Sequence, residues 1–317
     1  MNDFLHILAF SFSVTGPIFV ILGAGVVLLR TGMLTDAFVD SGSRLVFNIA
    51  LPALLFISIG QTHIEETANF ALVGYGMAAT CVVFLLLEWL AARFIEPARD
   101  RGVVVQGAFR SNMGIIGLAY CVNAYGEAGL VAASLYLGLV TILFNVLSVI
   151  ALQRSLQRGG SGIARMVRGI ATNPLIIGIL AGLLVSASGL ELPQIVLKSG
   201  QYFADLTLPL ALLCTGAALD FRSLREQLSS TLFAAVAKLV AIPLLFVAGG
   251  VAIGLHGIEL GVLLLMSSAP TAAASYVMVR AMGGNAPLAA NIVALTTVGS
   301  LLTTSAGITL LRVLGMI

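Results

Sequence analysis

Apolar runs recur along the whole chain, separated by short charged interruptions. Each run is about 20 residues long, the length that a helix needs to cross the ~30 Å hydrocarbon core of a bilayer. Composition agrees, because 59% of the 317 residues are hydrophobic and 9% are charged, too few charges to cover a domain of this size in water. The sequence therefore predicts an all-α membrane protein. We expect ten transmembrane spans, at residues 10–30, 39–60, 69–93, 102–124, 127–152, 170–190, 194–219, 228–254, 257–282 and 287–314.

Catalytic and nucleic-acid-binding classes find no support in the residues. The net charge of +2 is too small to indicate a nucleic acid partner. The three cysteines lack C-x-x-C spacing, the three histidines share no metal-ligand spacing, and the sequence has no H-E-x-x-H, G-x-S-x-G or P-loop motif. We therefore expect no enzyme activity, no cofactor and no bound metal.

The positive charges lie mainly on one side of the predicted membrane. Of the 16 lysines and arginines, twelve fall in the odd-numbered connections between spans, whereas Lys198 and Arg312 fall on the opposite side. Cytoplasmic loops of membrane proteins carry the excess of positive charge. We expect both termini outside and the linker at 153–169 in the cytoplasm.

That linker, which is rich in glycine, serine and charge, divides the ten spans into five and five. Short matches recur across it at offsets of 157 or 158 residues: Thr15-Gly16-Pro17 with Thr172-Asn173-Pro174, Ser41-Gly42 with Ser199-Gly200, Leu51-Pro52 with Leu208-Pro209, and Gly126-Glu127-Ala128 with Gly284-Asn285-Ala286. The sequence predicts two five-helix repeats, 1–152 and 170–317, and the odd span number makes the second inverted. Inverted repeats are typical of secondary transporters. A receptor or a passive channel fits the composition but not this repeat.

Polar and helix-breaking residues interrupt spans four and nine at corresponding positions. They are Arg110, Ser111, Asn112, Met113 and Gly114 in span four, and Pro270, Thr271, Ala272 and Ser275 in span nine. An opened helix presents a new N-terminus whose free N–H groups and positive dipole bind anions. We predict that these residues form a carboxylate site with Arg110 as the charged partner. The alternatives are kinks that serve packing only, and an arginine that extends to the cytoplasmic phosphates.

Four further polar residues lie at membrane depth: Asn48, Glu88, Asp205 and Lys238. Spans three and eight hold equivalent places in the two repeats, so we predict an ion pair between Glu88 and Lys238 that couples transport to an ion or supports the fold. Asn48 and Asp205 are predicted to be polar gate or scaffold groups, with a helix break at Leu208-Pro209. Hydrogen bonding between helices is the alternative for Asp205 and our interpretation of Asn145.

Four motifs resemble the auxin efflux carrier family, whose bacterial branch includes proteins called malonate or malate transporters. They are FRSNMGIIGL at 109–118, YGEAG at 125–129, LPLALLCTGAAL at 208–219 and APTAAASY at 269–276. Similarity runs from about Thr15 to the C-terminus. One departure is Ala119, which follows Gly117-Leu118 where family members commonly have a proline, and it predicts a less sharply broken span four.

The resemblance implies ten helices in two inverted repeats with crossing broken helices 4 and 9, as in sodium/bile-acid symporters and sodium/proton antiporters. It also implies a scaffold of helices 1, 2, 6 and 7, which can join two copies in a homodimer. Helices 3–5 and 8–10 would form a core that moves as an elevator.

The sequence thus predicts a secondary transporter of a small organic anion, a mono- or dicarboxylate, in a bacterial inner membrane. The alternative is a sodium- or proton-coupled carrier of a larger organic anion of the bile-acid-symporter type. An antiporter of that fold usually has paired acids at the crossover, and spans four and nine have none. Expected partners are the anion, a sodium ion or proton, and membrane lipid.

Overall fold

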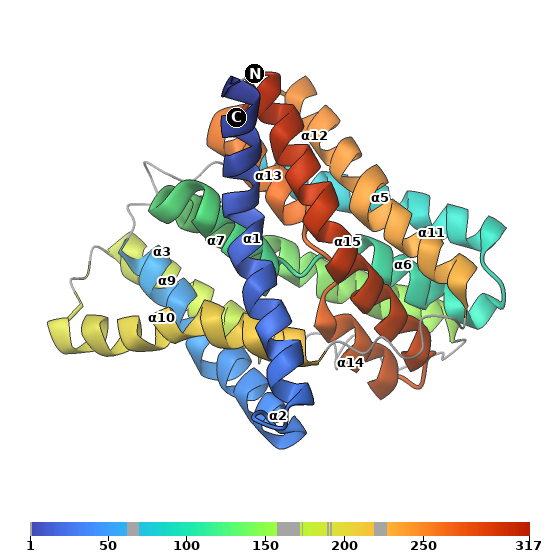
Figure 1. The fold of residues 1–317 in the computed structure, drawn as a ribbon, viewed down its shortest axis with the longest axis horizontal. Coiled ribbons are helices and arrows are strands. Elements are labelled where there is room, and N and C mark those ends of the chain that lie inside the picture. Colours follow the sequence, from blue (N-terminus) through green and yellow to red (C-terminus); the bar gives the residue numbers. More distant parts are fainter. Residues whose placement is uncertain are drawn as a thin grey trace.

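The protein is almost entirely helical over the residues that its computed structural model describes, which are 2–61, 70–156, 172, 174–188, 190, 192–218 and 227–317. These residues contain no β-strand, only one isolated bridge between Ser111 and Thr271. The all-α class is therefore confirmed (Figure 1).

The helices of the first half are α1 (Asn2–Arg30), α2 (Asp36–Leu45), η1 (Val46–Ala50), α3 (Leu51–Gly60), α5 (Phe70–Phe94), η2 (Ala98–Asp100), α6 (Arg101–Phe109), η3 (Met113–Gly117) and α7 (Leu118–Ser155). The short π-helical turn η1 joins α2 and α3 without a gap, and η3 leads directly into α7. α7 bends at Gly126, where φ is 58° and ψ is −138°, a conformation that glycine adopts readily. The bend separates the end of predicted span four from span five.

The helices of the second half are α9 (Pro174–Ser188), α10 (Gln194–Ala217), α11 (Leu228–Val236), η4 (Ala237–Ala241), α12 (Ile242–Ala252), α13 (Gly257–Ser268), α14 (Ala273–Ala281) and α15 (Ala286–Val313). α11, η4 and α12 form one continuous stretch. α10 continues through Pro209, so the helix break expected at Leu208-Pro209 is wrong. A proline removes one amide donor, and a membrane helix tolerates this loss where its neighbours satisfy the freed backbone groups.

Five helical stretches in the described residues are long and apolar enough to cross a membrane: Asp36–Ile57, Phe70–Phe94, Met113–Ser155, Leu228–Ala252 and Ala286–Val313. Three shorter apolar stretches are Gly16–Arg30, Ile176–Ser188 and Gly257–Ser268. Large apolar side chains such as Val20, Leu184 and Leu302 are exposed, as expected of surfaces that contact lipid. An integral membrane protein is therefore supported, while the number of ten spans stays a prediction.

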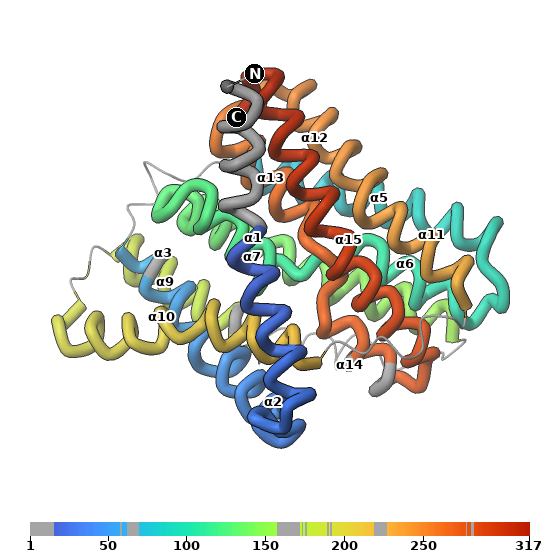
Figure 2. The backbone as a smooth tube through the Cα atoms, in the orientation of Figure 1, coloured from blue at the N-terminus to red at the C-terminus, as the bar shows by residue number. Residues whose placement is uncertain are grey.

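Two groups of helices lie on either side of α1. Figure 1 shows α3, α9 and α10 on one side, and α5, α6, α11, α12, α14 and α15 on the other, with α2 below the end of α1. α3 packs on α9 and α10, while α15 packs on α11, α13 and α14. The path of the chain through these helices can be followed in Figure 2. α7 contacts both groups, since it packs on α3 and α9 as well as on α5 and α6.

Candidate functional site

Two helices are interrupted inside the buried core. α6 ends at Phe109 and the helix resumes with η3 at Met113, while α13 ends at Ser268 and α14 begins at Ala273. These interruptions lie where the sequence predicts breaks in spans four and nine. In the second, Pro270 lacks an N–H and cannot donate the helical hydrogen bond, which favours a break at this position.

Span four is interrupted without a proline. Arg110 is extended, with φ −80° and ψ 97°, and Asn112 has φ −77° and ψ 62°. The amide of Gly117 then donates to the carbonyl of Asn112 at 2.9 Å, which starts the next helical turn. Span four is therefore broken, although Ala119 stands where family members commonly have a proline and was expected to make the break less sharp.

The two interrupted segments pair with each other through their backbones. Ser111 and Thr271 form an antiparallel bridge. Two backbone hydrogen bonds flank the bridge, from Asn112 N to Pro270 O (2.6 Å) and from Ala272 N to Arg110 O (3.0 Å). Because an unpaired amide in an apolar interior is costly, each segment stabilises the open conformation of the other.

Side-chain hydrogen bonds anchor this crossing to the surrounding helices. Thr271 Oγ1 donates to the carbonyl of Gly107 at 2.6 Å, and its amide donates to Thr296 Oγ1 at 3.1 Å. Ser111 Oγ donates to the carbonyl of Ser267. Ser111 and Thr271 are both buried, so the crossing is fixed to α6, α13 and α15 at once.

Lys238 reaches the crossing from η4 and is completely buried. Its Nζ donates to the carbonyl of Ser267 at 2.8 Å and to Ser111 Oγ. The predicted ion pair with Glu88 is wrong, because Glu88 Oε2 lies 3.2 Å from Arg154 Nη1. Glu88 sits near the end of α5, beside the end of α7, whereas Lys238 lies in the middle of the α11–α12 stretch.

Arg110 is buried beside the crossing and points toward α7 and α14. Its Nη2 donates to Asn145 Oδ1 at 2.7 Å, and its Nη1 donates to Ser148 Oγ at 3.2 Å and Met278 Sδ at 3.4 Å. In the part of the chain that the structure describes, neither Arg110 nor Lys238 forms an ion pair with a carboxylate. Buried cations without an acidic partner are costly, so the crossing is an environment that favours an anion.

Several residues of this site were not predicted from the sequence. Gln106 is fully buried one helical turn before Arg110, and its Nε2 donates to Met278 Sδ at 3.2 Å. The i, i+4 spacing, which places Gln106 and Arg110 on one helix face, was the available signal. Asn145 was interpreted as a group that bonds between helices; it does so, with Arg110 as its partner.

Among the residues that the structure describes, two buried oxygen atoms of the interrupted helices have no hydrogen-bond partner: Gln106 Oε1 and Ser275 Oγ. Buried polar groups in proteins are nearly always paired. Ser275 precedes Met278 by one turn of α14, and Gln106 precedes Arg110 by one turn of α6. Gln106 donates to Met278 Sδ and Ser275 lies one turn from Met278 on α14, so both residues belong to the surroundings of Met278.

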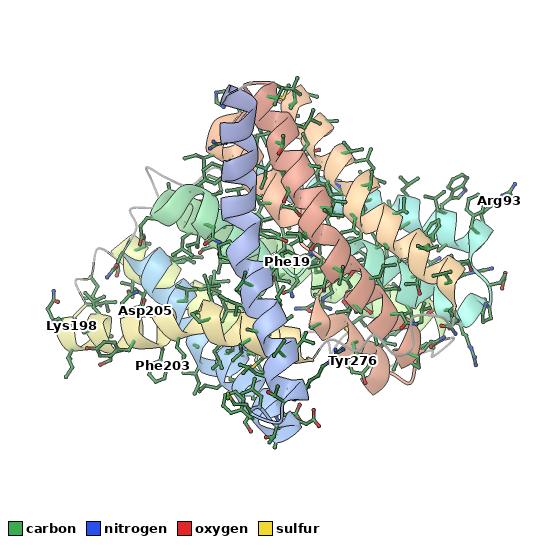
Figure 3. The ribbon with its side chains drawn as sticks, in the orientation of Figure 1. Phe19, Arg93, Lys198, Phe203, Asp205 and Tyr276 are labelled. Atoms are coloured by element: carbon green, nitrogen blue, oxygen red, sulfur yellow. The ribbon has the colours of Figure 1, made fainter. Side chains whose placement is uncertain are left out.

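The remaining predicted residues occupy different environments. Met113 is buried, while Gly114 and Ala272 are partly exposed at the starts of the resumed helices. Asn48 is exposed and donates to the carbonyl of Arg44 at 2.9 Å. Asp205 is exposed on α10, where it accepts from Gln201 Nε2 at 2.7 Å (Figure 3). The structure does not bring Asn48 or Asp205 to the crossing.

Known proteins that are similar to this chain along most of its length are named as transporters. An "Uncharacterized transporter" of Methanothermobacter thermautotrophicus is 24% identical over 90% of this chain and 93% of its own. A second "Uncharacterized transporter", from Methanocaldococcus jannaschii, is 25% identical over 86% of this chain and 89% of its own. A "Putative malonate transporter" of Rhizobium meliloti is 26% identical over 90% and 93% of the two chains.

The family description "Membrane transport protein" matches residues 12–159 and 163–308, nearly the whole chain. This match confirms the resemblance drawn from the motifs around Asn112 and Pro270, and it indicates a transporter rather than an enzyme. The chain belongs to the membrane transport protein family, the family of the auxin efflux carriers.

Proposed function

We propose that this transporter moves a small organic anion, a mono- or dicarboxylate, that binds where the two interrupted helices cross. The observation that carries the proposal is the pair of buried cations, Arg110 and Lys238, which have only neutral hydrogen-bond partners in the described residues. An anion bound beside them would offset the cost of burying their charge.

Arg110 is the group best placed to bind a carboxylate directly. Besides Asn145 and Ser148, its guanidinium donates to Met278 Sδ, a weak acceptor. A carboxylate oxygen is a much stronger acceptor than this sulfur for the same N–H. The Ser275 hydroxyl would donate one more hydrogen bond to the anion, and Gln106 would contribute through its Nε2 donor, since its Oε1 only accepts. The amides at the starts of η3 and α14 add the positive ends of helix dipoles.

The Rhizobium meliloti relative, by its name, supports a dicarboxylate of three carbons as the first substrate to test. A dianion matches a site that holds two cations. The second candidate is a larger organic anion carried together with a sodium ion or proton, as in bile-acid symporters; the absence of paired acids at the crossing of the described helices disfavours it.

For the mechanism we propose ten spans in two inverted repeats and elevator-type alternating access. The scaffold would consist of α1, the α2–α3 stretch, α9 and α10, and the moving core of α5–α7 and α11–α15. This division is supported by the packing of α3 on α9 and α10 and of α15 on α11, α13 and α14, and the two groups meet where α1 packs on α15. Within this proposal the scaffold also joins two copies in a homodimer.

Uptake of radiolabelled malonate into proteoliposomes tests the site. We expect Arg110→Ala to reduce the initial rate at least tenfold, because the charge and the fork of donors are lost together. Arg93→Ala is the matched control, since Arg93 is exposed at the far end of α5 (Figure 3). Equal uptake by Arg110→Ala and the unmodified protein, at equal reconstituted amounts, would refute the arginine assignment.

The same vesicles test coupling. Imposed sodium and proton gradients are compared with equal ion concentrations on both sides. Uptake that depends on one gradient identifies the coupled ion. If the vesicles take up a larger carboxylate but not malonate, the second candidate is favoured.

A further inference from the structure

A second polar site lies at one end of the molecule, apart from the crossing. A cavity of about 420 Å³ opens between the end of α5, the start of α6 and the end of α7. Its walls include Trp89 from α5, Arg101 from α6, and Arg154 and Ser155 from α7. None of the residues at the crossing lines it.

The cavity wall holds two guanidinium groups, from Arg101 and Arg154, and one carboxylate, from Glu88. Each arginine has one acidic partner, Glu96 for Arg101 and Glu88 for Arg154, and Glu96 does not line the cavity. Arg154 uses Nη1 for Glu88, and Arg101 uses Nε for the carbonyl of Ile95 and Nη2 for Glu96. Because a guanidinium has five N–H donors, each arginine keeps donors for a further anion.

An apolar stripe leads away from the mouth of the cavity along α5. Val82, Leu85 and Trp89 are between 64% and 66% exposed, and their spacing places them on one face of the helix. Seven residues of helix extend this stripe over ~10 Å. Tryptophan is enriched where a membrane protein meets the headgroup region, so we expect the cavity to lie at headgroup level and the stripe at acyl-chain level.

We propose that this cavity binds the phosphate of an anionic phospholipid, with an acyl chain along Val82 and Leu85. Basic pockets between membrane helices on the cytoplasmic side are suited to lipid phosphates, and the distribution of positive charge along the sequence predicts that this end of α5 faces the cytoplasm. A free phosphate would use the arginines but leave the apolar stripe uncovered. The proposal does not depend on which substrate is transported.

Trp89 provides a direct readout, because it is the only tryptophan in the sequence. The full chain is reconstituted in phosphatidylcholine vesicles that contain a small fraction of phosphatidylglycerol with brominated acyl chains, which quench tryptophan on contact. Brominated phosphatidylcholine at the same fraction is the reference. We expect the anionic lipid to quench Trp89 at least threefold more strongly, and equal quenching by both lipids would overturn the proposal.

The double variant Glu88→Gln/Arg154→Gln removes the cavity's ion pair without leaving either charge alone. We expect it to lose the preference for phosphatidylglycerol, as does Arg101→Gln, a second variant that leaves the Glu88–Arg154 pair in place. Arg93→Gln is the control, because Arg93 is exposed at the end of α5 and does not line the cavity. A preference that survives both cavity variants, or that Arg93→Gln loses equally, contradicts a specific site.

Glycerol 3-phosphate and inorganic phosphate separate the two sources of phosphate. Neither carries acyl chains, so we expect neither to reverse the quenching at millimolar concentration. Full reversal by either one would show that the cavity takes a soluble phosphate, and the lipid assignment would be wrong.

Discussion

Lys238 shows how one side chain holds the crossing together. Its ammonium bonds to the carbonyl of Ser267 and to Ser111 Oγ, one group on each interrupted helix. Lys238→Ala leaves both acceptors buried without their charged donor, and we expect it to lower the free energy of unfolding by about 2–4 kcal/mol. Lys198→Ala is the control, since Lys198 is exposed on α10 (Figure 3), and its effect should stay within about 0.5 kcal/mol. Thermal unfolding in detergent compares them, and equal melting temperatures would refute this role.

Thr271 anchors the second interruption through one hydroxyl. Its Oγ1 donates to the carbonyl of Gly107 in the fully buried core. Thr271→Val keeps the shape but removes the donor, and we expect a loss of about 1–3 kcal/mol because a buried carbonyl is left unsatisfied. Thr271→Ser keeps the hydroxyl and should retain most of the stability. If the valine variant is as stable as the serine variant in the same thermal assay, the hydrogen bond does not stabilise the crossing.

At the scale of elements, α1 and α10 pack with their backbones close together. A Cβ on Gly25 of α1 would clash with the carbonyl of Leu213, and one on Gly216 of α10 would clash with the carbonyl of Leu22. Gly25→Ala should therefore separate the helices and cost about 1–3 kcal/mol. Gly23→Ala, two residues away on α1 with open space around it, should be neutral or stabilising by up to about 1 kcal/mol. Comparable destabilisation by both, measured by thermal unfolding, would contradict the close packing.

At the scale of the whole molecule, the distribution of charge predicts the orientation in the membrane. The predicted five spans before the 153–169 linker and five after it would place the linker and the C-terminus on opposite sides of the membrane. Alkaline phosphatase, which is active only outside the cytoplasm, should be active when fused after Ile317 and inactive when fused within the linker. A fluorescent protein that folds only in the cytoplasm should give the reverse pattern. Activity of the same reporter at both positions would exclude an odd number of spans between them.

The two interruptions could be located from the sequence because their causes are local. Pro270 cannot continue a helix, and the polar run from Arg110 to Asn112 has no place on a lipid-facing surface. The same local reasoning was wrong at Pro209, where α10 continues. A proline sets a requirement on the backbone, but neighbouring helices decide how that requirement is met.

Side-chain partners were harder to predict. Equivalent positions in two repeats suggested a Glu88–Lys238 pair, yet Glu88 meets Arg154 and Lys238 meets Ser111, 127 residues away. Repeat equivalence relates whole helices, whereas a salt bridge depends on how each helix is rotated. Met278 and Gln106 lie at the site because of helix rotation as well. Neither residue type indicates an anion site in a sequence.

The apolar runs, their length and the polar residues within them were enough to establish a helical membrane protein with two opened helices, because hydrophobicity and proline act on the segment that contains them. The positions of the buried cations relative to acceptors and acids came from packing. Arg110 and Lys238 acquire their environment from residues 29 to 168 positions away in the chain. Such contacts are set by the crossing and rotation of helices, which the periodicity of a single segment does not encode.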